Sequence, residues 1–211
     1  SAPHSPCCCR AEQSLDLKKA KGNNMHALVT IHNAVFGLVE KAGTWVLPLA
    51  ARFVFAATLL LYYWNSGLTK LGDGILGLFS PSIGAYSQIF PKQLEAAGYD
   101  VSQFGIFHQL VVLAGTYAEF ILPLLILLGL FTRLAALGMI GFIIVQSLTD
   151  VIGHNATDAK TLGALFDRFP DSIILDQRLF WVFVLAVLVI KGAGALSLDR
   201  IIKRRLETEA M

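Results

Sequence analysis

The segment LVVLAGTYAEFILPLLILLGLF, residues 110–131, decides the fold of this chain. As an α-helix rising about 1.5 Å per residue, it is long enough to cross roughly 30 Å of hydrocarbon. Its only charged residue, Glu119, lies near its middle. Inserting a charged side chain at that depth costs at least about 2.5–3.5 kcal/mol, so such residues usually have a charged partner or a function. Glu119 is therefore the first candidate for a catalytic residue.

The composition places the chain in a membrane. Of its 211 residues, 55% are hydrophobic and 15% are charged, and the mean hydropathy is +0.62. These values exclude an ordinary soluble domain and are typical of one compact membrane unit, so the lipid bilayer is the first expected binding partner. The net charge of +2 is too small to indicate a nucleic-acid partner. All three cysteines, residues 7–9, precede the apolar segments, which argues against a membrane thiol oxidase.

Four segments have the length and hydrophobicity of membrane spans: residues 46–64, 110–131, 134–149 and 179–197. Basic residues gather before the first segment, after the last and at Arg133, whereas the connections 65–109 and 150–178 are mainly acidic. Under the positive-inside rule, both termini then lie in the cytoplasm. The sequence thus predicts a multi-pass protein of a bacterial cytoplasmic (inner) membrane.

Aromatic and charged residues alternate at near-helical spacing in residues 89–107 and 160–169 of the outer connections. Such stretches are typical of helices that lie at the membrane surface. The predicted fold class is therefore all-α: a four-transmembrane-helix bundle with interfacial helices in the outer loops and at the N-terminus.

This topology divides the chain into four parts. Residues 1–24 form a polar tail that is either disordered or upstream of a natural start at Met25. Residues 25–45 are a cytoplasmic interfacial segment, residues 46–200 are the membrane domain, and residues 201–211 are a basic and polar cytoplasmic tail.

Polar residues recur on one face of the first two predicted spans. Arg52, Tyr63, Ser66 and Lys70 share a face if the first helix continues past its apolar part, and His108 shares a face with Glu119. If the two faces meet, Glu119 lies among cationic groups. Such a cluster can bind a polar headgroup such as a quinone carbonyl, with the carboxylate as proton acceptor and Lys70 or His108 as donor. The alternative is an ion pair between Arg52 and Glu119 that only fixes the register of the helices.

Metal binding is not predicted. Gln146, Asp150 and His154 recur at helical spacing, as metal ligands sometimes do. The third span, however, is expected to end near Asp150, because Gly153 and Asn155 follow it as turn signals. The sequence also lacks a CxxCH haem-attachment motif.

Several short motifs occur in a fixed order along the chain: Arg52, Gly67–Lys70 (GLTK), Glu119, Leu128–Arg133 (LGLFTR) and Gly192–Asp199 (GAGALSLD). This order, over residues 48–200, resembles the DoxX family of small four-span bacterial and archaeal membrane proteins. The resemblance implies that Gly67, Arg133 and Asp199 belong to structural motifs. It also implies a link to quinone-dependent sulfur oxidation, after which the family is named.

Two functions from different classes fit these features. The first is an integral membrane subunit of a quinone-linked oxidoreductase, with Glu119 as the catalytic residue and a substrate-binding set of Arg52, Lys70, His108 and Tyr63. In that case the chain has no intrinsic cofactor, binds a quinone, and acts with other membrane or peripheral redox proteins that hold the redox centres. The second is a non-enzymatic accessory or structural subunit that docks onto a larger membrane complex.

Overall fold

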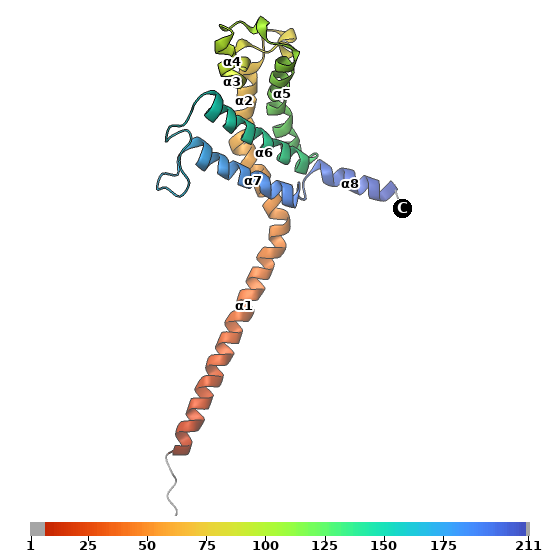
Figure 1. Ribbon diagram of the computed structural model, residues 1–211. Coiled ribbons are helices and arrows are strands. Elements are labelled where there is room, and N and C mark those ends of the chain that lie inside the picture. Colours follow the sequence, from red (N-terminus) through yellow and green to blue (C-terminus); the bar gives the residue numbers. More distant parts are fainter. Residues whose placement is uncertain (1–6, 210–211) are drawn as a thin grey trace, which may run out of the picture. The chain divides into compact units, whose positions relative to one another are not determined.

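A computed structural model describes the backbone of residues 7–209 (Figure 1), with side chains for residue 26 and residues 28–209 apart from 75 and 76. The chain divides into two compact units, residues 1–44 and residues 45–211. The side chains of the three cysteines lie outside the described part. Within that part the regular structure is helical, apart from one isolated β-bridge between Leu71 and Pro81.

Eight α-helices and several shorter helical turns make up the described chain. The α-helices are α1 (Cys7–Phe55), α2 (Leu61–Lys70), α3 (Ile83–Ile89), α4 (Pro91–Ala96), α5 (Ile106–Leu128), α6 (Thr132–Leu148), α7 (Arg178–Lys191) and α8 (Leu198–Glu209). The shorter pieces are π-helical turns at Ala56–Leu60, Thr149–Gly153 and Ile173–Gln177, and 3₁₀ turns at Ile75–Leu78 and Val101–Gln103.

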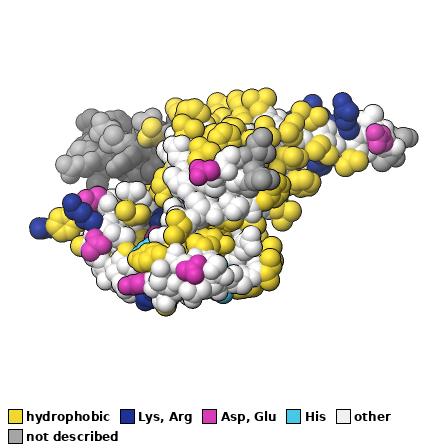
Figure 2. Space-filling view, turned by 90° about the horizontal axis from the view of Figure 1, so that it is seen from above, with side chains coloured by type: hydrophobic (Ala, Val, Ile, Leu, Met, Phe, Trp, Pro, Cys, Tyr) yellow, Lys and Arg dark blue, Asp and Glu magenta, His cyan; other side chains and the backbone are white. Residues whose placement is uncertain are grey.

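The prediction of four membrane spans is confirmed. Four helical stretches of the described residues are long and apolar enough to cross a bilayer: Leu28–Lys70, Ile106–Leu128, Thr132–Gly153 and Ile173–Lys191. The fourth stretch ends earlier than the predicted 179–197, because Gly192 adopts a φ of +79° and stops the helix. Hydrophobic side chains cover much of the surface seen in Figure 2, as is usual for helices that face lipid.

The two long connections between spans differ from one another. In the first, part of the predicted stretch 89–107 is helical, because α4 covers Pro91–Ala96, and α3 (Ile83–Ile89) precedes it. In the second, residues 160–169 form turns in place of the helix that their spacing indicated. Asn155, Gly163 and Phe166 all have positive φ angles, which interrupt any helical path through this segment.

The core of the membrane domain lies between α6 and its neighbours. Helix α6 packs against both α5 and α7, and α2 packs against α5. The fully buried large side chains of this core include Phe55, Tyr63, Ile126, Met139, Ile143, Leu185 and Leu188. At Gly67 a Cβ atom would lie 2.6 Å from the Phe120 ring, so glycine permits the close approach of α2 and α5.

Arg52 and Asp199 hold together the ends of three helices. The Arg52 guanidinium donates hydrogen bonds to the backbone carbonyls of Ile126 and Leu127 in the last turn of α5, and to those of Ala193 and Leu196 after α7. These carbonyls lie at or just after helix ends, where α-helical backbone donors run out, so the guanidinium supplies further donors to them.

Asp199 completes this arrangement at the N-terminus of α6. Its carboxylate accepts hydrogen bonds from the backbone N–H groups of Phe131 and Thr132, at 2.7 and 3.0 Å. Gly129 has a φ of +68°, and a Cβ there would lie 2.7 Å from Ser197 Cβ and 3.0 Å from Arg52 Cζ. The motifs LGLFTR and GAGALSLD therefore meet at one structural site, which we call the Arg52–Asp199 clamp.

Arg133 contributes a neighbouring contact. Its guanidinium donates to the carbonyl of Ile190 at 3.2 Å, near the end of α7, and lies against Gly192. The motif residues Gly67, Arg133 and Asp199 thus all occupy packing or capping positions.

We expect Asp199→Ala to lower the free energy of unfolding by about 1–2 kcal/mol, because two N–H groups at the start of α6 lose their carboxylate. Glu207→Ala on α8 is the control, since Glu207 is exposed and its nearest cation, Lys203, lies 3.8 Å away. The control should stay within about 0.5 kcal/mol of wild type. Equilibrium unfolding in detergent measures both, and equal effects would contradict a capping role for Asp199.

Candidate functional site

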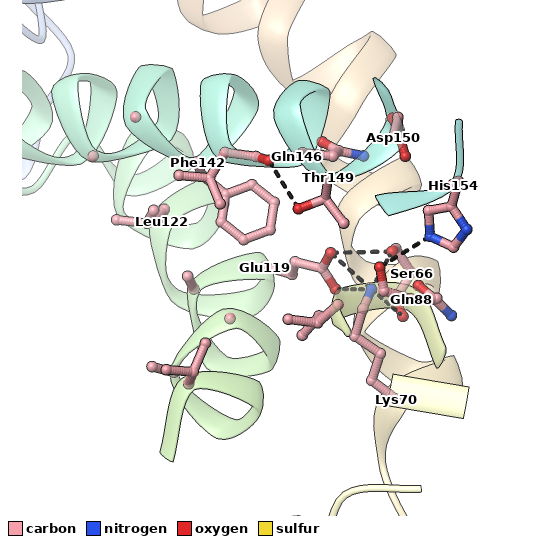
Figure 3. Close-up of a pocket in the computed structure, with 18 residues that line it drawn as sticks. Ser66, Lys70, Gln88, Glu119, Leu122, Phe142, Gln146, Thr149, Asp150 and His154 are labelled. Atoms are coloured by element: carbon pink, nitrogen blue, oxygen red, sulfur yellow. Dashed lines mark hydrogen bonds and ion pairs between the residues drawn. The ribbon is translucent and has the colours of Figure 1, made fainter. Parts of the chain in front are cut away.

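Glu119 forms a buried ion pair with Lys70. The Lys70 Nζ lies 2.9 Å from both carboxylate oxygens, and the two residues are only 4% and 2% exposed. Ser66 joins them, because its hydroxyl accepts a hydrogen bond from Lys70 at 2.7 Å and donates one to Glu119 at 3.1 Å (Figure 3). The prediction that Glu119 has a basic partner inside the bundle is confirmed, and that partner is Lys70.

The local sequence explains why these three groups meet. Ser66 and Lys70 are four residues apart on α2 and so lie on one face of that helix. Lys70 is the last residue of α2, where the helix dipole favours a positive charge. Gly67 on the intervening turn lets α5 approach closely enough for Glu119 to reach both side chains.

A cavity of about 400 Å³ adjoins the ion pair. Residues of α2, α3, α5, α6 and the turn after α6 line it. Its polar lining residues are Ser66, Lys70, Gln88, Glu119, Gln146, Thr149, Asp150 and His154. Figure 3 shows Lys70, Gln88 and His154 at one end, and Leu122 and Phe142 at the other. The cavity is therefore polar at one end and apolar at the other.

A second ion pair lies beside the polar end. The Arg178 guanidinium donates to Asp150 Oδ2 at 2.6 Å and to the Ser147 hydroxyl at 2.9 Å, and Arg178 is only 4% exposed. Arg178 was not among the predicted site residues, because it lies at the end of a connection that is mainly acidic. The sequence did contain a signal for this pair: basic Arg178 lies next to the start of the fourth predicted span, and acidic Asp150 lies next to the end of the third.

The row Gln146, Asp150 and His154 does lie on the wall of this cavity. His154 Nε2 is 3.2 Å from the carbonyl oxygen of Gln88, which links the turn after α6 to α3. Among the described residues, no three His, Cys, Asp or Glu side chains are grouped closely enough to hold a metal ion.

The predicted pairing of Arg52 with Glu119 is wrong. Arg52 belongs to the Arg52–Asp199 clamp, and its hydrogen bonds go to backbone carbonyls. Arg52 and Lys70 are separated by 18 residues, or roughly 27 Å along a helix, so they lie at different depths. Periodicity predicted a common face on the basis of an unbroken helix, and it could not indicate which residue reaches Glu119.

Tyr63 and His108 lie apart from the ion pair. Tyr63 is fully buried among the rings of Tyr62, Phe142 and Trp181, and its hydroxyl is 3.4 Å from Gln146 Oε1. It therefore supports the cavity wall from behind.

His108 packs edge-on against Phe90, Phe104 and Phe107. Neither His108 nor Tyr63 is among the residues that line the cavity. The structure thus brings together Glu119 and Lys70 of the predicted set, adds Ser66, and places the other three residues elsewhere.

Comparison with known proteins gives one match. The DoxX family model matches residues 47–150, a range that contains Arg52, the ion pair and Arg133. No curated protein and no solved structure matches the chain.

The ion pair predicts a strong energetic coupling between Lys70 and Glu119. Lys70→Met should destabilise the protein by about 3–5 kcal/mol, because Glu119 then remains buried without its cation. Lys70→Met combined with Glu119→Leu should cost clearly less than Lys70→Met alone. A double-mutant cycle on the exposed pair Lys203 and Glu207 is the control, with a coupling below about 1 kcal/mol. Additive effects at Lys70 and Glu119 would rule out a direct pair.

Proposed function

Because the chain belongs to the DoxX family of multi-pass membrane proteins, we propose that it is the membrane subunit of a quinone-linked oxidoreductase and that its buried ion pair binds the quinone headgroup. The observation that carries this proposal is the cavity beside Lys70 and Glu119. Its volume of about 400 Å³ lies within the usual range for small-molecule sites, roughly 300–1,000 Å³.

The chemistry of a quinone suits a cavity of this kind. A quinone headgroup is a flat apolar ring with two carbonyl oxygens, and the cavity joins an apolar end to a few polar groups. Lys70 Nζ donates to Ser66 and to both oxygens of Glu119, and it would hold a quinone carbonyl oxygen by turning one of its three N–H bonds from these partners into the cavity. Glu119, which shares the wall with Lys70, is positioned to exchange a proton with the same oxygen.

In the proposed reaction, a redox centre on a partner protein donates two electrons to the quinone. The two carbonyl groups become two hydroxyl groups, so the reaction also consumes two protons. Glu119 accepts one proton from the aqueous side, transfers it to the oxygen that Lys70 holds and returns to the carboxylate, and the second proton reaches the other oxygen from the aqueous side. Lys70 stabilises the negative charge that develops on the oxygen before the proton arrives.

We further propose a bacterial cytoplasmic membrane with both termini in the cytoplasm. The supporting observation is the run of bases on α8, Arg200, Lys203, Arg204 and Arg205, directly after the last span. The partner that donates electrons is a membrane or peripheral redox protein.

One observation favours a different function, a non-enzymatic accessory subunit. Lys70, Glu119 and Ser66 already satisfy one another by hydrogen bonds. Such a group can have the single role of fixing how α2 and α5 align with one another, without binding a ligand.

The variant Glu119→Gln separates the two functions. The amide keeps the shape of the side chain but cannot accept a proton. For a quinone site, we expect normal assembly, at least about tenfold weaker binding of a quinone with no tail, and loss of quinone-dependent electron transfer. Glu95→Gln on α4 is the control, because Glu95 is exposed and does not line the cavity. Reduced assembly with unchanged binding and turnover would favour the accessory subunit.

The proposed orientation predicts which positions a membrane-impermeant thiol reagent labels in intact cells. With residues 7–9 changed to serine, Ser102→Cys and Ala164→Cys should react from outside, because both residues are exposed in the outer connections. Thr208→Cys on α8 should react only after the cells are opened. The reverse pattern would invert the orientation.

A further inference from the structure

The cavity beside the ion pair opens sideways between α5 and α6. Ala114 of α5 and Gly138, Gly141 and Val145 of α6 all line the cavity, and all four are exposed on the surface of the bundle. They lie in the interior of two membrane spans, Ile106–Leu128 and Thr132–Gly153. The opening therefore lies along the length of these spans, where exposed helix surface faces lipid.

The two glycines at this opening differ in the space beside them. A Cβ atom at Gly141 would meet nothing within 4 Å, so the space next to it is free. A Cβ at Gly138 would lie 3.3 Å from the Leu122 side chain, so glycine there lets Leu122 of the apolar end pack closely against α6. A flexible hydrocarbon chain fits such a passage, because it needs neither hydrogen bonds nor a fixed shape.

The passage leads inward to charged groups. From Gly141 the wall continues through Phe142 and Gln146 of α6 toward the polar end, where Lys70 and Glu119 lie. One wall thus changes from apolar to ionic within a single cavity. A molecule that occupies all of it must have an apolar part and a polar head.

We infer that the ligand of this cavity carries a long hydrocarbon tail and enters from the bilayer between α5 and α6, with the tail against Gly138 and Gly141. The inference rests on the proposed function, which assigns the headgroup to Lys70 and Glu119. It adds that the substrate is a lipid-soluble quinone taken from within the membrane, and that its entrance lies between α5 and α6.

The opening between α5 and α6 could instead hold a transmembrane helix of a partner protein, because small residues on a helix let another helix approach closely. The cavity favours the tail, because a helix interface needs only a shallow surface, whereas this opening leads to two buried charges. Binding of a partner helix is one of the outcomes that the following experiment distinguishes.

The test fills the passage and compares two quinones with the same headgroup, one with a ten-carbon tail and one with none. Gly141→Leu places a side chain in the free space, and we expect it to weaken binding of the tailed quinone by about tenfold or more. Binding of the tailless quinone should change by less than about twofold, because Lys70 and Glu119 are untouched. The ratio of variant to wild type for each ligand cancels its partitioning into detergent.

Gly37→Leu on α1 is the matched control, since a Cβ there also meets nothing within 4 Å and Gly37 does not line the cavity. It should leave both affinities unchanged. If Gly141→Leu fails to fold, Val145→Phe at the same opening carries the test.

The remaining outcomes overturn the inference in different ways. Equal losses for both quinones would mean that the variant damages the headgroup site, and no loss for either would place the tail elsewhere. In both cases the proposed function would still stand if the tailless quinone binds to wild type and if Glu119→Gln weakens that binding. Loss of a co-purifying membrane partner with both affinities intact would assign the opening to a helix. If wild type binds neither quinone, the proposed function fails as well.

Discussion

The absence of water in hydrocarbon is the constraint on which this structure depends. Each charge and each unpaired backbone group in the spans must find its partner within the protein. Glu119 finds Lys70 and Ser66, Arg178 finds Asp150 and Ser147, and Arg52 finds four carbonyls at helix ends. The polar residues of the spans are therefore few, and each of them has specific partners on another part of the chain.

These polar contacts divide into two kinds. The Arg52–Asp199 clamp binds backbone groups and stays away from the cavity, so its role is to fix how α5, α6 and the segment after α7 end. The pair of Lys70 and Glu119 joins two side chains on the wall of a cavity. Only the second kind presents ionisable groups to a space that a ligand can fill.

The sequence was sufficient for the spans, because length and hydrophobicity decide whether a helix crosses a bilayer. It was also sufficient to identify Glu119 as a site residue and to name Lys70, with Arg52 and His108, as one of its possible partners. It was not sufficient for Arg52, since periodicity gives the face of a helix but no depth. Arg178 was missed because it ends a connection that is mainly acidic, and the turns of residues 160–169 depend on positive φ angles that spacing does not show.

The π-helical turn Ala56–Leu60 has a consequence for the phase of the first span. A turn of this kind contains one residue more than an α-helical path, so every later residue is rotated by about 100° relative to an unbroken helix. The first span therefore consists of two helices with separate phases: α1 directs Arg52 to the clamp, and α2 directs Lys70 to the cavity. Without the extra residue, one of these two side chains would point the wrong way. The wide turn thus lets a single span serve two sites that require different rotations.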